Sequence, residues 1–421
     1  MALSRIWAAF ILVSILVAGV RYAFVPADKE IFSNMVVGKA GDGGQSADGI
    51  IETCTHAVTL ALGLIGIMAL FMGLVSIAEQ AGGMRFLARI TAPFFSRLFP
   101  DLPKGHPAMG HMVMNFSANL LGLDNAATPF ALKAMDSLQT LNPEKDTATN
   151  AQIMFLVLHT SGLTLIPLTM IAYRSGMHAL QPTSIFIPCI VTTVASTLLS
   201  ILVMVFVQRL RVDWVLILGL LGLVALVAGL LFFVSHLSGP QREAFSRVAG
   251  NVLLLTIIMT FIGAGLYKKV ALFDAFVEGA KEGWGVIVRI LPYLVGMMVA
   301  VRVFRDCGAL DYTVSGITWL VRQTGLNSDF TPALPVAIMR PFSASGSRAL
   351  MLTTMQTYKP DSFQGNLACI MQNSAETTFY IIALYFGGVG IKKVRYAIWA
   401  GLTADLLGVI CAIAVAYIFF H

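Results

Sequence analysis

The chain has 421 residues, of which 57% are hydrophobic and only 12% are charged. Soluble domains carry about a quarter charged residues, and a soluble globule of this length could not bury so much apolar surface. The same composition excludes a disordered chain. The net charge of +6 is spread thinly along the sequence, which argues against nucleic-acid binding and fits the cytoplasmic loops of a membrane protein.

The N-terminal segment, residues 1–24, has a short basic lead at Arg5 followed by an apolar run. It lacks a small-residue cleavage site followed by a soluble domain, so it predicts a first membrane helix rather than a signal peptide. Apolar runs of about 20 residues mark membrane helices, and nine are predicted. They cover residues 5–25, 51–79, 151–173, 184–208, 213–236, 249–267, 287–305, 364–387 and 395–419.

Two further apolar stretches, 107–137 and 330–358, are interrupted by polar and small residues. The interruptions fall at residues 115–119, 124–129 and 340–348. Irregular backbone at membrane depth is tolerated only where protein or a watery cavity surrounds it. Both stretches therefore predict re-entrant helical hairpins. The amphipathic segments that precede them, 84–99 and 310–324, predict helices lying in the membrane interface.

Four pairs of segments recur in order along the chain, which predicts an internal repeat. The pairs are 31–38 with 272–279, 72–82 with 298–308, 116–118 with 342–344, and 159–164 with 372–377. The two middle pairs share an offset of 226, and the last pair has an offset of 213. We therefore expect a first repeat over residues 1–210, a linker helix over 211–244 and a second repeat over 245–421.

The basic residues predict the orientation of the chain. With the N-terminus inside, 16 Lys and Arg residues fall on inner segments and eight on outer ones. This bias favours a cytoplasmic N-terminus and an external C-terminus. The two hairpins then enter from opposite sides as an inverted repeat. In secondary transporters with that architecture, the substrate site lies near the membrane midplane between the repeats.

Long motifs in the two halves resemble a known family. The first half carries HPAMGHMVMNFSANLLGLDNAATPFALKAM (106–135) and FLVLHTSGLTLIPLTMIAYR (155–174), and residues 50–205 resemble spore maturation protein A. The second half resembles spore maturation protein B over residues 249–415. Its motifs are LPYLVGMMVAVRVFRDCGALD (291–311), PALPVAIMRPFSASGSRALM (332–351) and MQNSAETTFYIIALYFGGVGIKKVRYA (371–397).

The chain thus resembles a fused form of two proteins of the gate, or nucleoside-recognition, domain group. That group is similar to the membrane portion of ferrous-iron transporters and, more distantly, to concentrative nucleoside transporters. The resemblance implies a transporter-like fold with paired hairpins in the bacterial inner membrane, and it leaves the substrate open. The chain departs from the family at His159, where Asn is frequent, and at Asn373, where Gly is frequent.

The second hairpin carries the first candidate site, with Arg340 and Arg348 flanking Ser343 and Ser345. Arginine at membrane depth must be paired or face a cavity, and its guanidinium suits bidentate binding of carboxylate or phosphate. Ser343, Ser345 and Arg348 are predicted to bind substrate. The alternative is structural: Arg348 pairs with Glu376 or Asp361 and locks the hairpin. For Arg340 the structural role is favoured.

A polar run within an apolar helix, residues 372–378, is the second candidate. Glu376 is its one charged residue, and an intramembrane carboxylate is a functional hypothesis by default. We predict that Glu376 couples transport to H⁺ or Na⁺, with a salt bridge to Arg348 or Arg340 as the alternative. The predicted substrate ligands here, with their counterparts in the first repeat, are Gln372, Asn373, Ser374, Thr377, Ser161 and Thr164.

The first hairpin supplies the third candidate, since Asn and Asp can cap a broken helix and leave a side chain toward a ligand. The predicted substrate ligands are Asn119, Asp124, Asn125 and Thr128. Pure capping is the alternative. Asp405, within an apolar helix, either relays protons or pairs with a neighbour. His56 and His159 are expected to be packed or hydrogen-bonded rather than to act as ligands.

These features predict an all-α polytopic membrane protein that is a secondary transporter of a small polar or anionic metabolite, such as an amino acid, a nucleoside or a dicarboxylate. A metal-ion permease and a non-transporting membrane scaffold are the alternatives. No nucleophile–base pair or phosphate loop is recognisable, so neither an enzyme nor a cofactor is expected. The expected partners are the substrate, a coupling ion, the lipid bilayer and a second copy of the chain.

Overall fold

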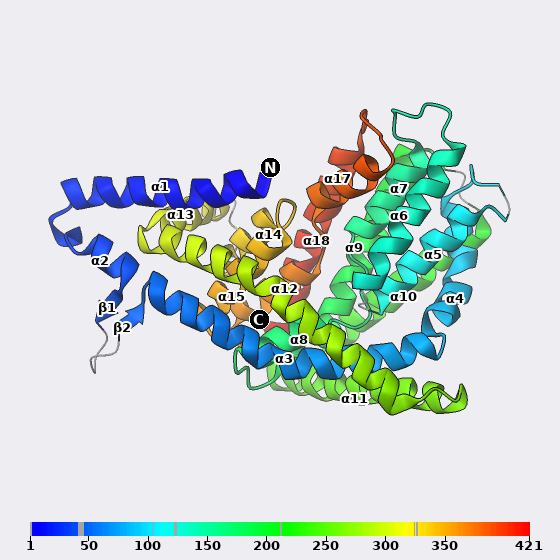
Figure 1. The fold of residues 1–421 in the computed structure, drawn as a ribbon, viewed down its shortest axis with the longest axis horizontal. Coiled ribbons are helices and arrows are strands. Elements are labelled where there is room, and N and C mark those ends of the chain that lie inside the picture. The colour runs from blue at the N-terminus through cyan, green and yellow to red at the C-terminus, as the bar shows by residue number, and fades with distance from the viewer. Residues whose placement is uncertain are drawn as a thin grey trace.

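The computed structural model describes residues 2–40, 46–103, 105–121, 124–210, 213–323, 325 and 327–421. The fold is helical apart from a short pair of antiparallel strands (Figure 1). The elements are α1 (Ala2–Phe24), η1 (Pro26–Asp28), α2 (Ile31–Val36), β1 (Gly38–Ala40), β2 (Ser46–Asp48), α3 (Ile50–Gln80), α4 (Gly83–Leu98), α5 (Pro107–Leu120), α6 (Asp124–Leu141), α7 (Asn150–Thr160), α8 (Leu168–Gly176), η2 (Pro182–Ile185), α9 (Phe186–Val207), α10 (Trp214–Ser235), α11 (Gly239–Tyr267), α12 (Leu272–Asp306), α13 (Ala309–Gln323), η3 (Thr331–Ala333), α14 (Leu334–Met339), α15 (Ala344–Tyr358), α16 (Phe363–Asn373), α17 (Thr378–Gly388) and α18 (Ala397–Phe420).

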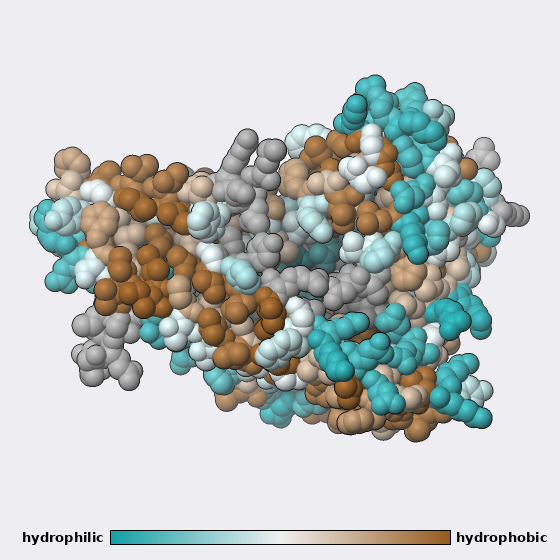
Figure 2. Space-filling model, in the orientation of Figure 1, coloured by the Kyte–Doolittle hydropathy of each residue, from teal (hydrophilic) through white to brown (hydrophobic). Residues whose placement is uncertain are grey.

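The prediction of an all-α polytopic membrane protein is confirmed. Six helices of the described chain are long and apolar enough to cross a membrane: Trp7–Phe24, Ile50–Gln80, Pro182–Val207, Trp214–Ser235, Ala244–Tyr267 and Ala397–Phe420. The side chains of α1, α10 and α11 are largely exposed, as expected for helices that face lipid. Figure 2 shows hydrophobic side chains over α1 and α12, and hydrophilic ones gathered around the loops beyond α6, α7 and α17.

Two predicted membrane spans are wrong as continuous helices. Residues 151–173 form α7 and α8, and residues 364–387 form α16 and α17. Each break contains polar residues that are concealed when hydrophobicity is averaged over a whole span. The predicted span 287–305 is the C-terminal part of the 35-residue helix α12.

Both predicted hairpins are present as pairs of packed helices, α5 with α6 and α14 with α15. Their turns differ from the prediction. Helix α5 runs without interruption through 115–119, and α6 already begins at Asp124. In the second hairpin the turn spans 340–343, and Ser343 caps α15 by accepting a hydrogen bond from the Gly346 amide at 3.0 Å. The polar residues of the two hairpins therefore lie within or at the ends of helices and do not interrupt them.

The repeat is visible in the element boundaries. Helices α3 and α12 are each followed by a left-handed glycine, Gly82 with φ 88° and Gly308 with φ 84°, and these two glycines are related by the offset of 226 found in the sequence. Glycine is favoured there because it adopts positive φ without strain. Helices α7 and α16 match at both ends with the second offset, 213, and Thr149 and Ser362 cap their N-termini.

Corresponding helices of the two repeats run antiparallel. In the pair α3 and α12, Gly73 packs against Phe276 while Gly283 packs against Met68 and Ala69. The order of contacts along one helix is therefore reversed along the other. Antiparallel packing of equivalent helices is what an inverted repeat requires.

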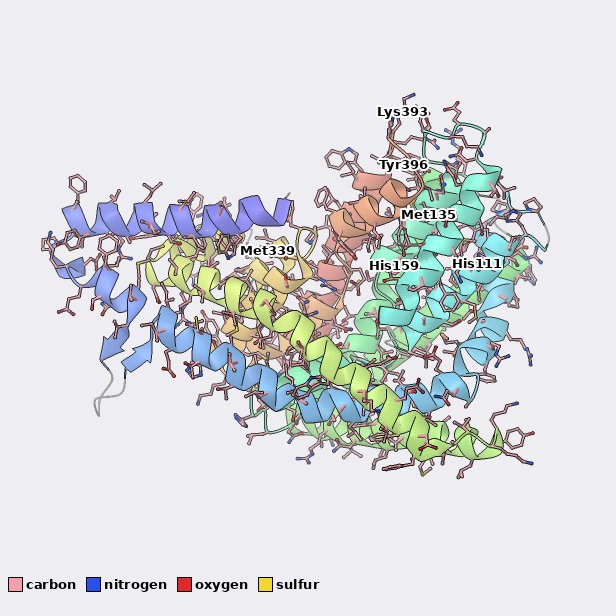
Figure 3. All side chains as sticks on the ribbon, viewed as in Figure 1. His111, Met135, His159, Met339, Lys393 and Tyr396 are labelled. Atoms are coloured by element: carbon pink, nitrogen blue, oxygen red, sulfur yellow. The ribbon has the colours of Figure 1, made fainter. Side chains whose placement is uncertain are left out.

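The pair α9 and α18 shows the same reversal. Gln208 at the end of α9 donates a hydrogen bond to the Tyr396 hydroxyl at the start of α18, at 3.0 Å. One half-helix further along, Ser196 of α9 lies against Gly408 of α18. The loops at this end also meet, because Lys393 forms an ion pair of 3.0 Å with Asp146 (Figure 3).

At the other end of the contact between the two repeats lies a buried arginine. Arg174 at the end of α8 is 0% exposed. Its guanidinium donates to the Pro360 carbonyl at 2.6 Å, to Asn366 Oδ1 at 2.6 Å and to Asp361 Oδ1 at 2.7 Å. These partners lie on the second repeat, so Arg174 fastens the two repeats together.

Candidate functional site

The two broken helices cross at their breaks. The α7–α8 break follows Thr160, and the α16–α17 break follows Asn373. The Glu376 amide donates to the Thr160 carbonyl at 2.8 Å. Gly162 has φ 63°, and a Cβ on it would lie 3.2 Å from the backbone of Ala375. The two breaks thus pass so closely that the α7–α8 break has a glycine at this position.

Each hairpin turn docks on the break of its own repeat. The Leu165 amide donates to the Leu120 carbonyl at the tip of the first hairpin, at 3.1 Å. The Phe379 amide donates to the Pro341 carbonyl at the tip of the second, also at 3.1 Å. Broken helices leave backbone groups without intrahelical partners, and a membrane offers no water to replace them. The hairpins supply some of those partners and meet at the crossing.

A cavity of about 230 Å³ lies beside this crossing. Both hairpins and both breaks contribute to its wall. The polar and charged lining residues are Asn119, Thr128, His159, Thr164, Thr169, Arg340, Arg348, Gln372, Asn373, Glu376 and Tyr380. The apolar lining comes mainly from α3 and from the segment that enters α8: Met68, Phe71, Met72, Ile166, Leu168 and Met170.

His159, at the C-terminal end of α7, is held by a hydrogen-bonded cluster (Figure 3). Its Nδ1 lies 3.0 Å from Asn119 Nδ2, 2.8 Å from the Tyr385 hydroxyl and 3.3 Å from Asn115 Oδ1. Asn119 Nδ2 can only donate to Nδ1, whereas Asn115 Oδ1 can only accept from it, so one ring tautomer satisfies one of these two contacts and not the other. None of these contacts uses Nε2, which leaves that ring nitrogen for an occupant of the cavity.

The two arginines of the second hairpin differ. Arg340 is 7% exposed; its Nε donates to the Ala375 carbonyl at 2.6 Å, and its Nη2 lies 3.4 Å from Glu376 Oε2. The Arg348 guanidinium carbon lies 5.4 Å from the centre of the Tyr173 ring. Its Nε is buried without a hydrogen-bond partner, and no carboxylate of the described chain lies within 4 Å of it.

The structural alternative for Arg348 named the wrong partners. Glu376 pairs with Arg340, and Asp361 pairs with Arg174 at 2.7 Å. The reason is helical phase: Arg348 lies in the second turn of α15 and faces α8, whereas Arg340 in the turn reaches the α16–α17 break. Arg340 has the structural contacts that were expected of it and also lines the cavity.

The structure brings seven of the predicted site residues together in the cavity wall: Asn119, Thr128, Thr164, Arg348, Gln372, Asn373 and Glu376. Five others lie outside the lining: Ser161, Ser343, Ser345, Ser374 and Thr377. Ser161 and Ser374 donate to carbonyls of the preceding turn, at 2.9 Å each, and Ser343 caps α15. The side chains of Asp124 and Asn125 lie outside the described residues.

Four polar lining residues were not predicted as ligands: His159, Thr169, Arg340 and Tyr380. His159 and Gln372 are related by the repeat offset of 213, and both line the cavity. The repeat offset was therefore a usable signal for His159. Tyr380 follows Glu376 by four positions, which would place both on one face of a continuous helix, but Glu376 lies in the break before α17. Predicting Tyr380 as a lining residue required knowing where the helix breaks, because the break determines which face of α17 points into the cavity.

Comparison with known proteins agrees with this architecture. The family model described as Gate, nucleoside recognition, matches residues 61–176 and 287–392, which together make up more than half of the chain. The chain belongs to this family. Its two matched segments coincide with the two sets of hairpin and broken helix described above.

Two curated relatives each match about two fifths of the chain. Spore maturation protein B of Bacillus subtilis (strain 168) is 41% identical over 174 residues, which is 40% of this chain and 96% of that protein. Spore maturation protein A of the same organism is 40% identical over 156 residues, which is 37% of this chain and 80% of that protein. The resemblance to both proteins is thereby confirmed, and the chain is a membrane protein of transport or scaffold type.

Proposed function

We propose that this Gate-family protein is a secondary transporter of a small metabolite that carries an anionic group. The observation that carries the proposal is the cavity at the crossing of the two broken helices. Both repeats line it with polar side chains, and the two hairpin tips border it. In transporters with inverted repeats, discontinuous helices form the substrate site at the repeat interface.

The charges of the cavity favour an anion. Arg340 and Glu376 are paired at 3.4 Å and largely offset each other. Arg348 contributes a positive charge that no carboxylate of the described chain neutralises within 4 Å. A guanidinium in such surroundings suits bidentate binding of a carboxylate or phosphate. The charge balance therefore favours amino acids and dicarboxylates over uncharged nucleosides.

The remaining lining would orient the rest of the substrate. His159 Nε2 supplies a ring nitrogen for hydrogen bonding, and Asn119, Thr128 and Gln372 supply donors and acceptors. The apolar wall from α3 and α8 would receive the carbon skeleton. A few placed polar groups in a mostly apolar cavity are typical of a small-molecule site.

Alternating access follows from the symmetry of the fold. Equivalent helices run antiparallel, so rocking one repeat against the other exchanges an inward-open for an outward-open arrangement. We propose that the protein lies in the bacterial inner membrane with a cytoplasmic N-terminus and an external C-terminus, and that the repeats span 1–210 and 245–421 around a linker helix at 211–244.

The test has two stages. Purified protein is screened by thermal unfolding against amino acids, dicarboxylates and nucleosides, and compounds that raise the unfolding midpoint are tested for uptake into proteoliposomes. Arg348→Ala should abolish the shift for anionic compounds. Arg322→Ala is the matched control, because Arg322 lies on α13 outside the cavity. Stabilisation by divalent transition metals alone would favour a permease. Stabilisation without uptake would favour a scaffold, and either result overturns the proposal.

A further inference from the structure

A second intramembrane carboxylate lies behind the cavity. Asp405 of α18 is 5% exposed, and its Oδ2 accepts a hydrogen bond of 2.7 Å from the hydroxyl of Thr378. Its Oδ1 is buried without a partner. Among the described residues no Lys, Arg or His lies within 4 Å of it, and Arg340 and Glu376, whose charges act on it, pair with each other. An unpaired carboxylate in a membrane interior is costly and marks a functional site by default.

Further oxygen atoms lie beside the next turn of α18. Gly408 lies one turn after Asp405 on α18, and the position of its missing Cβ is 2.8 Å from the Ser374 carbonyl oxygen, 3.2 Å from Ser374 Oγ and 3.3 Å from Ser196 Oγ. The hydroxyls of Ser196 and Thr377 are both buried without a partner. Ser374 and Thr377 belong to the α16–α17 break, and Thr378 begins α17. One carboxylate, one carbonyl of a broken helix and several hydroxyls therefore gather between α9, α18 and the break.

This set of atoms suits a metal cation better than a proton. A proton on Asp405 would neutralise the carboxylate but leave the Ser196 and Thr377 hydroxyls unsatisfied. Hard cations bind several oxygen ligands, and in transporters unwound backbone carbonyls and the C-terminal ends of half-helices coordinate Na⁺. The C-terminal end of α16 adds its negative dipole at the same point. One carboxylate matches a singly charged ion.

We propose that Asp405, Ser374, Thr377 and Ser196 form a Na⁺ site behind the cavity. The segment 374–378 joins this site to the cavity, because Glu376 lines the cavity, Ser374 lies against Gly408, and the Thr378 hydroxyl donates to Asp405. Na⁺ binding would fix the break in one conformation and so couple the ion to the substrate. That use of the site rests on the proposed transport function, but Na⁺ binding itself does not.

The experiment is thermal unfolding of the purified full-length protein in detergent, with tryptophan fluorescence as the readout. NaCl is titrated against choline chloride at constant ionic strength, with KCl in a parallel series. The wild-type midpoint should rise with Na⁺ and reach a plateau, as expected for a ligand that binds the folded state, and should rise less with K⁺. Asp405→Asn should raise the half-saturating Na⁺ concentration by about tenfold or more, the order of loss when a metal site loses a supporting group.

Three further variants make the test specific. Ser196→Ala removes a hydroxyl that has no partner, so it should fold normally and still weaken Na⁺ binding; it carries the test if Asp405→Asn fails to fold. Thr192→Val removes an unpartnered hydroxyl one turn away on α9, and Glu376→Gln removes the cavity carboxylate. Both should keep the wild-type Na⁺ dependence.

The proposal is overturned by a wild-type midpoint that responds equally to all three salts, by an unchanged Na⁺ dependence in Asp405→Asn, or by a dependence that Glu376→Gln alone removes. Uptake separates this proposal from the proposed function. Na⁺ binding at Asp405 without transport of any compound would leave the site standing and refute the transporter. Transport that is independent of Na⁺, in a protein that Na⁺ does not stabilise, would refute only the site.

Discussion

The contacts of Arg340 and Glu376 predict that the two residues have unequal effects on stability. Arg340 is 7% exposed, and its Nε bonds the Ala375 carbonyl of the helix break at 2.6 Å. Its ion pair with Glu376 is longer, at 3.4 Å, and the Glu376 side chain is 41% exposed. The backbone contact therefore holds the second hairpin to the break, while the ion pair adds a smaller contribution.

The expected magnitudes follow from these contacts. A hydrogen bond from a charged donor contributes about 1.5–3 kcal/mol, and a partly exposed ion pair contributes about 0–1 kcal/mol. We expect Arg340→Ala to lower the free energy of unfolding by about 2–4 kcal/mol, because it removes both contacts. Glu376→Gln should cost only about 0–1 kcal/mol, because the Arg340–Ala375 bond remains.

The assay is reversible unfolding in mixed micelles of SDS and a mild detergent, with both single variants and the double variant. The double variant should resemble Arg340→Ala alone. If Glu376→Gln instead costs as much as Arg340→Ala, and the double variant recovers most of the loss, then the two residues form a mutual lock whose single removal leaves an uncompensated charge. That result would refute the reasoning and the assignment of Glu376 to the cavity.

Three further predictions follow. Arg174→Met should destabilise the protein by about 3–5 kcal/mol, because it leaves the Asp361 carboxylate and buried acceptors of the second repeat without their partner. A loss below about 1 kcal/mol in the same micelle assay would show that Arg174 does not hold the two repeats together. Gly162→Ala should lower the unfolding midpoint, because positive φ strains a side chain there and the new Cβ would meet Ala375 at 3.2 Å; an unchanged midpoint would show that the crossing is looser than described. In a cysteine-free background, Lys145→Cys and Lys359→Cys should react with an impermeant maleimide from opposite faces of the membrane, and reaction from one face would disprove the proposed topology.

Composition and periodicity were enough to predict the membrane class, most of the long helices and the repeat. Long helices are legible in sequence because hydrocarbon demands about 20 apolar residues for each span. Equivalent helix ends of the two repeats can be matched for a similar reason: Gly82 with Gly308, and the cap Thr149 with the cap Ser362. Helix ends use a small set of residues whose preferences are local.

The broken helices were predicted as continuous membrane spans, although the polar run at 372–378 was recognised. A window as long as a membrane span averages the polar run at 374–377 with its apolar flanks, so α16 and α17 merge into one predicted span. Whether a polar run breaks a helix depends on the partners available to the freed backbone groups. Here these partners are Thr160, Arg340 and Pro341, which are distant in sequence. No local pattern contains that information.

The candidate site shows the same division. Residue types alone showed which positions were too polar for lipid, and they predicted Arg348, Glu376 and Asp405 as intramembrane charges that need an explanation. Only the tertiary structure decided their partners, because the phase of each helix and the place of each break set the direction of the side chain. It placed Arg340 rather than Arg348 beside Glu376, and it left Asp405 among unsatisfied oxygens. The cost of removing a charged side chain from water depends on that residue alone, whereas the partner that offsets this cost depends on the geometry of the whole fold.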